Sequence, residues 1–129
     1  MPPKGLSFRD RTVLVTGASA GIGQAIAEVF ASEGFDLVLT ARRLDRLEAL
    51  AGDLRQRFGR RVMTIADDLA DPAAPGRIVE AVSQAGLTID ALVNNAGYGV
   101  PGKFTDTTWE QQRDMVQVMV MALAELTHR

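Results

Sequence analysis

The sequence predicts an α/β fold: a doubly wound parallel sheet of four strands in the order 3-2-1-4, with four helices. Two observations predict the α/β class, and the strand order is one that doubly wound folds share. Short apolar runs alternate along the chain with segments in which apolar residues recur at helical spacing. Glycine follows most of the helical segments, where it can end a helix. Strands that alternate with helices form parallel sheets through right-handed crossovers, which place helices on both faces.

The four expected strands are short apolar runs that end beside glycine or polar residues. They span residues 12–15, 37–40, 61–65 and 89–93. The side chains of a strand alternate between the two faces of a sheet, so largely apolar runs are typical of parallel strands that are buried on both faces. We therefore expect helices to cover the sheet on both sides.

The first three expected helices each carry an apolar stripe at helical spacing. The stripes consist of Ile22, Ala25, Ile26, Val29 and Phe30, of Leu44, Leu47, Leu50, Leu54 and Phe58, and of Ile78, Val79 and Val82. Gly34, Gly59 and Gly86 follow these stripes and are expected to end the helices. Asp71-Pro72 is the expected start of the third helix.

The fourth expected helix begins where Thr107 and Glu110 fit a capping box. Its apolar residues point in nearly every direction around its axis: Val116, Val118, Met119, Val120, Met121, Leu123 and Leu126. The sheet can cover only one side of such a helix. Either it is a poorly wrapped, methionine-rich helix, or another surface covers it. Because nothing is expected to pair with the outer edge of the fourth strand, the sequence favours a homo-oligomer or a complementary chain that binds the fourth helix and this edge.

Length and composition limit the functions that the chain can have. Its 129 residues are expected to form one domain, residues 1–129. Fourteen Lys and Arg against sixteen Asp and Glu give a net charge of -2, which argues against general binding of nucleic acid or anionic membranes. The absence of cysteine excludes disulfides, thiolate metal sites and cysteine nucleophiles. No apolar run approaches the roughly 20 residues that cross a bilayer, and no apolar signal core follows Met1 to Lys4, so a cytoplasmic location is expected.

The loop between the first strand and the first helix reads T-G-A-S-A-G-I-G over residues 16–23. Its glycines Gly17, Gly21 and Gly23 allow a tight turn and close approach of a ligand, and the helix that follows offers unpaired N–H groups to phosphate. Gln24 stands where a nucleotide triphosphatase loop would continue with lysine. The strand–turn–helix context favours a dinucleotide site over a purely structural turn.

The end of the second strand indicates which dinucleotide would bind. An acidic residue there would bind the ribose hydroxyls of NAD, but the strand ends in Thr40-Ala41-Arg42-Arg43. Asp36 lies at the opposite end of the strand. Guanidinium groups form paired, charge-assisted bonds to phosphate, which favours NADP over NAD. The alternative is that both arginines are simply solvated.

Two further polar motifs follow the third and fourth strands. Asp68-Leu69 lies at the carboxyl edge of the sheet, where the carboxylate can accept a hydrogen bond from an adenine amino group or cap the third helix. The N-N-A-G run at residues 94–97 ends the fourth strand, where side-chain amides can brace neighbouring strands. By composition alone this run indicates a turn.

Together the three motifs resemble those of the short-chain dehydrogenase/reductases, and the resemblance covers the chain from Leu6 onwards. It implies a Rossmann-like fold, a nicotinamide cofactor and alcohol–carbonyl interconversion in the complete enzymes. It would place Ser19 and Ile22 at the pyrophosphate, Arg42 at the 2′-phosphate and Asp68 at adenine. The cofactor-binding residues implied by motif and resemblance are Gly17, Ser19, Gly21, Ile22, Gly23, Arg42, Asp68, Leu69, Asn95, Ala96 and Gly97.

The chain also departs from this family, because it resembles only the cofactor-binding, N-terminal half. The catalytic serine and the Y-x-x-x-K motif of the family lie in the other half, and the fourth position after Tyr98 is Gly102. Met119 occupies the position of a helix asparagine, and a thioether cannot donate a hydrogen bond. We therefore predict no catalytic residues and no activity for this chain alone. The alternative to half of an enzyme is a non-catalytic nucleotide-binding or self-associating domain.

Overall fold

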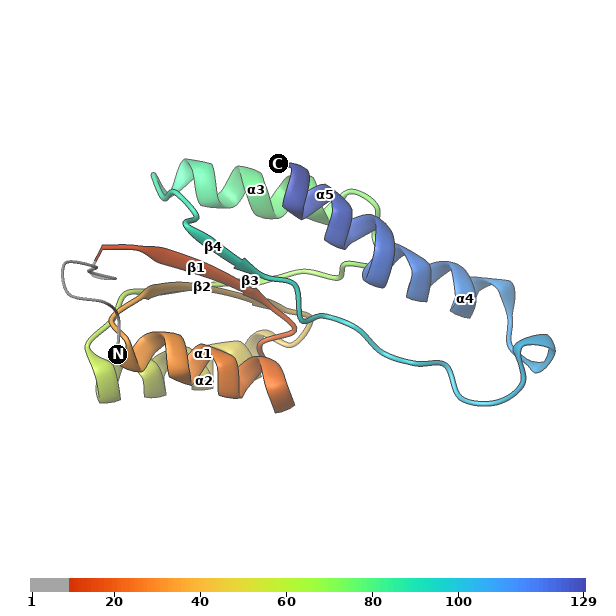
Figure 1. Cartoon of the computed structure of the whole chain (residues 1–129), viewed down its shortest axis with the longest axis horizontal. Coiled ribbons are helices and arrows are strands. Elements are labelled where there is room, and N and C mark those ends of the chain that lie inside the picture. The colour runs from red at the N-terminus through yellow and green to blue at the C-terminus, as the bar shows by residue number, and fades with distance from the viewer. Residues whose placement is uncertain (1–9) are drawn as a thin grey trace.

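The computed structural model describes residues 10–129, which form a parallel four-stranded sheet between two layers of helices (Figure 1). The segment from Met1 to Lys4, and Leu6, lie outside the described residues. The strand order β3-β2-β1-β4 is the one that the sequence predicts. The elements are β1 (Thr12–Thr16), α1 (Gly21–Ser32), β2 (Asp36–Ala41), α2 (Leu44–Phe58), β3 (Val62–Ala66), α3 (Ala74–Gln84), β4 (Ala91–Val93), the 3-10 turn η1 (Phe104–Asp106), α4 (Trp109–Val116), the π-helical segment η2 (Gln117–Ala122) and α5 (Leu123–His128). The third and fourth strands start one and two residues later than expected.

The two faces of the sheet carry separate hydrophobic clusters, since neighbouring residues of a strand point to opposite sides. Val13, Val15, Leu37 and Leu39 belong to the cluster under α1 and α2. Leu14 and Val38 belong to the cluster under α3 and the C-terminal helices. All five residues of β1 are buried, which confirms the prediction that helices cover both faces.

The apolar stripe predicted for α1 is wrong in part. Ile22 is 72% exposed and Val29 is 61% exposed, whereas the buried face consists of Gly23, Ala27 and Ala31. Phe30 of the predicted stripe packs, half-buried, against the same cluster. At the start of α1, the close packing of Gly23 described below leaves room only for a small residue, so residue size decides the buried position there.

The second helix agrees better with the prediction. Leu47, Leu50 and Leu54 are buried, while Leu44 at the start is half exposed. Gly59 follows α2 with a φ of 63° and donates its N–H to Arg55, so it forms the expected left-handed end of the helix.

The starts of the last two long helices differ from the prediction. The third helix begins at Ala74 rather than at Asp71-Pro72, because the Asp71 carboxylate accepts the Ala73 N–H at 2.9 Å and forms a turn before the helix. The capping box of α4 consists of Thr108 and Gln111, one residue later than the predicted pair Thr107 and Glu110.

The predicted fourth helix is continuous from Trp109 to His128, but it contains the unpredicted π-helical segment η2. Its buried residues Val118, Ala122 and Leu126 are four residues apart. The rest of its apolar surface is exposed, as the sequence predicts, with exposed fractions of 41–57% at Val116, Met119, Val120, Met121 and Leu123. Among the described residues, no helix is both long enough and apolar enough to cross a membrane.

Candidate functional site

A cavity of about 320 Å³ opens where the loops that follow all four strands meet α4 and η2. This is the carboxyl edge of the sheet, where open α/β sheets bind their ligands. Most of the predicted site residues line it: Gly17, Ser19, Arg42, Asp68, Leu69, Ala96 and Gly97. The fold therefore brings together residues from three separate motifs.

The other predicted site residues lie beside or behind this cavity. Gly21 lines a neighbouring hollow together with Ser19. Ile22 is exposed at the start of α1. Gly23 and Asn95 lie behind the loop, where both pack against Gly17.

Glycine is needed at two positions of the loop for different reasons. Gly17 has a φ of 63°, which a residue with a side chain rarely adopts. A Cβ atom at Gly23 would lie only 2.2 Å from the carbonyl oxygen of Gly17, so only glycine lets α1 approach β1 this closely. The loop and the first turn of α1 form one tightly packed unit.

The first turn of α1 presents free backbone N–H groups. The residue before the helix is Ala20, and no side chain accepts the N–H groups of the first turn. No acidic residue lies in this turn either. The start of α4, by contrast, is closed by its capping box. An uncapped helix start without negative charge is suited to an anion such as phosphate.

Thr16 joins the end of β1 to the end of β4, a role that the sequence motif does not reveal. Its hydroxyl accepts the N–H groups of Asn95 and Ala96 at 3.0 and 2.9 Å and lies 3.4 Å from the carbonyl oxygen of Val93. Thr16 is only 1% exposed, so these bonds are shielded from water.

The two asparagines brace neighbouring elements, as we hypothesised. The side-chain amide of Asn95 donates to the carbonyl oxygens of Thr16 and Gly17, both at 3.2 Å. The side-chain amide of Asn94 donates to the hydroxyl of Thr127 at 3.1 Å, which ties the end of β4 to α5. The N-N-A-G run is therefore more than a turn.

Three arginines line the cavity on the side of α2, and they differ in their partners. The guanidinium of Arg43 pairs with Asp45 at 3.1 Å. This bond is the main cause that lowers the pKa of Asp45. Within residues 10–129, the guanidinium groups of Arg42 and Arg46 form no ion pair or hydrogen bond. Arg46 was not among the predicted site residues, although its position four residues after Arg42, on the following helix, places it on the same side of the cavity.

The structure rules out one of the two roles considered for Asp68, the capping of the third helix. Residues 68–71 form a tight turn in which Asp71 N–H donates to the Asp68 carbonyl at 2.9 Å. The Asp68 carboxylate accepts the Ala70 N–H at 2.9 Å through Oδ1, and it does not cap α3. Its Oδ2 atom and the N–H of Leu69 form no hydrogen bond within the described part of the chain.

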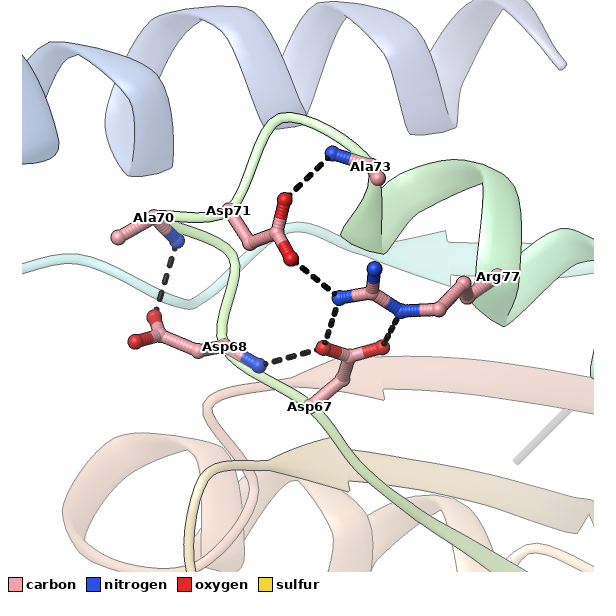
Figure 2. A network of polar contacts seen from close by, with 6 residues as sticks. All are labelled: Asp67, Asp68, Ala70, Asp71, Ala73 and Arg77. Carbon is pink, nitrogen blue, oxygen red and sulfur yellow. Dashed lines mark hydrogen bonds and ion pairs between the residues drawn. The ribbon is translucent and has the colours of Figure 1, made fainter.

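An arginine of α3 holds this turn (Figure 2). Arg77 pairs with Asp67 at 2.7 Å and with Asp71 at 2.8 Å. The hydrogen bond from Arg77 is the main cause that lowers the pKa of Asp67, and the Ala73 N–H followed by Arg77 lowers the pKa of Asp71. No sequence motif reveals the pair of Asp67 and Arg77, because the turn before α3 brings them together across ten positions.

The cavity is closed on its other side by the C-terminal helix and the loop before it. Tyr98, Asp114 and Val118 line it there. Met119 lies across Gly97, since a Cβ atom at Gly97 would be 3.3 Å from the Met119 Cε atom. No group of three His, Asp or Glu side chains suited to a metal ion occurs among residues 10–129.

Known proteins resemble this chain both in sequence and in fold. The sequence profile of the family described as short chain dehydrogenase matches residues 11–129. The chain is 37% identical over 118 residues to serine 3-dehydrogenase of Agrobacterium fabrum, an alignment that covers 91% of this chain and 46% of that enzyme. The chain thus spans about half the length of the curated relatives that it matches.

Solved structures show the same fold. L-sorbose reductase from Gluconobacter frateurii, complexed with NADPH and L-sorbose, has a TM-score of 0.89 and 38% identity, over 95% of this chain and 46% of that one. A short-chain dehydrogenase from Sphingobium yanoikuyae in complex with NADPH has a TM-score of 0.85 and 40% identity, over 92% and 46% of the two chains. With this sheet order, this glycine loop and a profile match across nearly its whole length, the chain belongs to the short-chain dehydrogenase family.

Proposed function

We propose that this chain binds NADP(H) and forms the cofactor-binding part, a single domain over residues 1–129, of an oxidoreductase that interconverts alcohols and carbonyl compounds. The observation that carries the proposal is the uncapped start of α1 beside a cavity lined by the unpaired guanidinium of Arg42. Relatives with the same fold were solved in complex with NADPH, which supports this cofactor.

The residues of the site fit a dinucleotide phosphate. Free N–H groups at the start of α1 suit the pyrophosphate, and a Cβ atom at Gly21 would meet nothing within 4 Å, so the backbone is open to a ligand there. Arg42 and Arg46 suit a ribose 2′-phosphate, since neither has an acidic partner among residues 10–129. No acidic side chain of residues 40–46 lines the cavity to bind the ribose hydroxyls of NAD instead.

The turn after β3 fits the base of the nucleotide. Adenine presents an amino group, which donates, next to a ring nitrogen, which accepts. Asp68 Oδ2 is an unused acceptor and the Leu69 N–H is an unused donor, and both residues line the cavity. An acceptor beside a donor is the pattern that adenine requires.

When bound, NADPH supplies a hydride, and the residues described above bind and orient it. Reduction of a carbonyl also needs a general acid. The serine and the Y-x-x-x-K motif of the family have no counterpart in these 129 residues, and Met119 cannot donate a proton or a hydrogen bond. We infer that the chain alone binds the cofactor without turning it over.

A second proposal concerns association. The exposed apolar face of the C-terminal helix and the outer edge of β4, which pairs only with β1 within residues 10–129, favour a homo-oligomer or a complementary chain. A self-associating domain without catalysis remains the alternative to half of an enzyme. We also propose a cytoplasmic location for the chain.

Calorimetry with NADP+ and NAD+ tests the proposed cofactor. We expect NADP+ to bind at least about tenfold more tightly, the equivalent of one charge-assisted contact. Loss of absorbance at 340 nm, measured with NADPH and a panel of ketones and aldehydes, tests the inferred inactivity. Failure to bind either dinucleotide would contradict the proposed cofactor binding, and sustained turnover would contradict the inferred inactivity of the chain alone.

A further inference from the structure

The guanidinium of Arg77 connects two carboxylates that flank the turn of residues 68–71 (Figure 2). Nε and Nη2 donate to the two oxygens of Asp67 at 2.9 and 2.7 Å, and Nη2 also donates to Asp71 Oδ2 at 2.8 Å. The Asp67 side chain is only 13% exposed, so this paired contact is better shielded than an ordinary surface ion pair. Arg77 thereby ties the residue before the turn to the residue that ends it.

The same carboxylates hold the backbone of the turn. Asp67 Oδ1 accepts the Asp68 N–H at 2.8 Å, and Asp71 Oδ1 accepts the Ala73 N–H at 2.9 Å. Figure 2 shows the Asp68 carboxylate directed away from Arg77, towards the Ala70 N–H. Because Arg77 orients Asp67 and Asp71, it also fixes the backbone amides that these two side chains bind.

We propose that Arg77 is a positioning residue for base recognition: acting through Asp67 and Asp71, it holds the turn so that Asp68 and Leu69 engage the adenine ring together. The inference rests on the proposed function, because it requires a dinucleotide in the cavity. Arg77 does not line the cavity, whereas Asp67, Asp68 and Leu69 do. Its effect on a ligand therefore passes through the turn.

The chemistry of the base provides a test that a purely structural role would not satisfy. Hypoxanthine replaces the amino group of adenine by a carbonyl oxygen and protonates the neighbouring ring nitrogen, so both hydrogen-bonding positions are reversed. A turn held in one geometry distinguishes the two bases. A loosened turn can adapt to either base and loses the distinction, while a general loss of folded protein weakens both ligands equally.

The experiment measures, by calorimetry on the full chain, the ratio of affinities for NADP+ and nicotinamide hypoxanthine dinucleotide phosphate. For the wild type we expect a ratio of about ten or more in favour of NADP+, from two lost hydrogen bonds. In Arg77→Met the ratio is expected to fall below about three, mainly through weaker binding of NADP+. Arg77→Lys should restore little, because an ammonium group cannot form the planar, two-bond contact with Asp67.

Arg57→Met is the matched control, since Arg57 forms an exposed ion pair with Asp53 on α2 and does not line the cavity. It should leave the ratio unchanged. If circular dichroism shows that Arg77→Met does not fold, Asp67→Asn replaces it. This variant retains the size of the side chain but loses its charge, and it should lower the ratio of the two affinities in the same way. A wild-type ratio that persists in the variants overturns this inference alone. A wild type that binds both dinucleotides equally overturns it together with the proposed role of Asp68 and Leu69 at adenine, but not cofactor binding by the chain. A wild type that binds neither contradicts the proposed function as well.

Discussion

The side-chain amide of Asn95 donates to the carbonyl oxygen of Gly17 at 3.2 Å, and so links the end of β4 to the glycine loop after β1. The same carbonyl oxygen lies against Gly23 in the first turn of α1. Three segments that are far apart in the sequence therefore meet at one backbone group. This arrangement holds the loop in place through the protein's own contacts, which is the preorganisation that tight binding of a diphosphate requires.

Arg42→Ala tests the recognition of the 2′-phosphate. We expect the affinity for NADP+ to fall by about tenfold and the affinity for NAD+ to stay the same, because the lost contact is with a group that only NADP+ carries. Arg43→Ala is the matched control, since that guanidinium is already paired with Asp45, and it should change the preference less. Calorimetry with both dinucleotides gives the two ratios. An unchanged ratio in Arg42→Ala would remove this role from Arg42.

Gly23→Ala tests the close packing of α1 on the loop. The new Cβ atom would lie 2.2 Å from the Gly17 carbonyl oxygen, so we expect a loss of about 1–3 kcal/mol in the free energy of unfolding, together with weaker binding of NADP+. Gly52→Ala, in the exposed interior of α2 with nothing within 4 Å, should instead stabilise by about 0.5–1 kcal/mol. Urea unfolding measures both. Equal effects would show that α1 can move away from the loop at little cost.

Thr16→Val and Thr40→Val compare two threonines that are paired in the sheet and almost fully buried. The Thr16 hydroxyl accepts two backbone N–H groups, and its removal leaves them unsatisfied, so we expect a destabilisation of about 2–3 kcal/mol. The Thr40 hydroxyl is buried without a partner, so Thr40→Val should be neutral or stabilising. Urea unfolding of the two variants and the wild type measures both changes in stability. Similar losses for both variants would contradict the prediction.

The lowered pKa of Asp36 makes the stability of the folded chain depend on pH. Burial raises the pKa of Asp36, but the Arg61 N–H and the guanidinium groups of Arg61 and Arg60 together hold the pKa below its ordinary value of 3.8. Since the pKa is lower in the folded state, the ionised carboxylate stabilises the fold above the unfolded-state value, and this stabilisation is lost as the pH falls through the folded-state value.

Asp36→Asn should therefore be less stable than the wild type at neutral pH, with a difference that narrows as the pH falls below about 5. Urea unfolding at several pH values measures this difference. Asp53→Asn, at an exposed ion pair with Arg57, is the control and should cost little at neutral pH. A difference for Asp36→Asn that stays constant down to about pH 3 would show that its charge is not responsible.

Met121→Lys tests whether the apolar face of the C-terminal helix mediates association. Met121 is 57% exposed, so the substitution should leave the folded monomer intact while it places a charge in the proposed interface. We expect the wild type to sediment as a dimer or larger species and the variant to shift towards monomer. Gln84→Lys, which adds the same charge on the exposed side of α3, should have no such effect. A monomeric wild type would mean that this face needs no partner in solution.

The sequence predicts the fold well where the conformation of a residue depends mainly on its neighbours in the chain. The left-handed glycine after α2 and the short apolar runs of the strands depend on backbone conformation and burial, which neighbouring residues reveal. The site residues that line the cavity follow from the same rules, because motifs at the ends of parallel strands meet at one edge of the sheet. Start positions are less certain, as Thr108 shows, because adjacent threonines both suit a helix cap.

The local sequence pattern does not predict which side chains are buried where a helix packs unusually close to its neighbour. Helical spacing predicts that Ile22 and Val29 are buried, but both are exposed and the buried face of α1 consists of Gly23, Ala27 and Ala31, where Gly23 packs against the glycine loop. The sequence pattern does not predict the π-helical segment η2 within the last helix.

The sequence by itself determined the alternation of strands and helices, the glycine loop and the basic end of β2, because each depends on residues close together in the chain. Only the tertiary structure decided that, among the described residues, Arg43 has an acidic partner while Arg42 and Arg46 have none, and that Arg77 of α3 holds the turn beside the cavity. Such pairings depend on distances between side chains of a few ångströms, which the packing of helices on the sheet sets and which no spacing along the chain specifies.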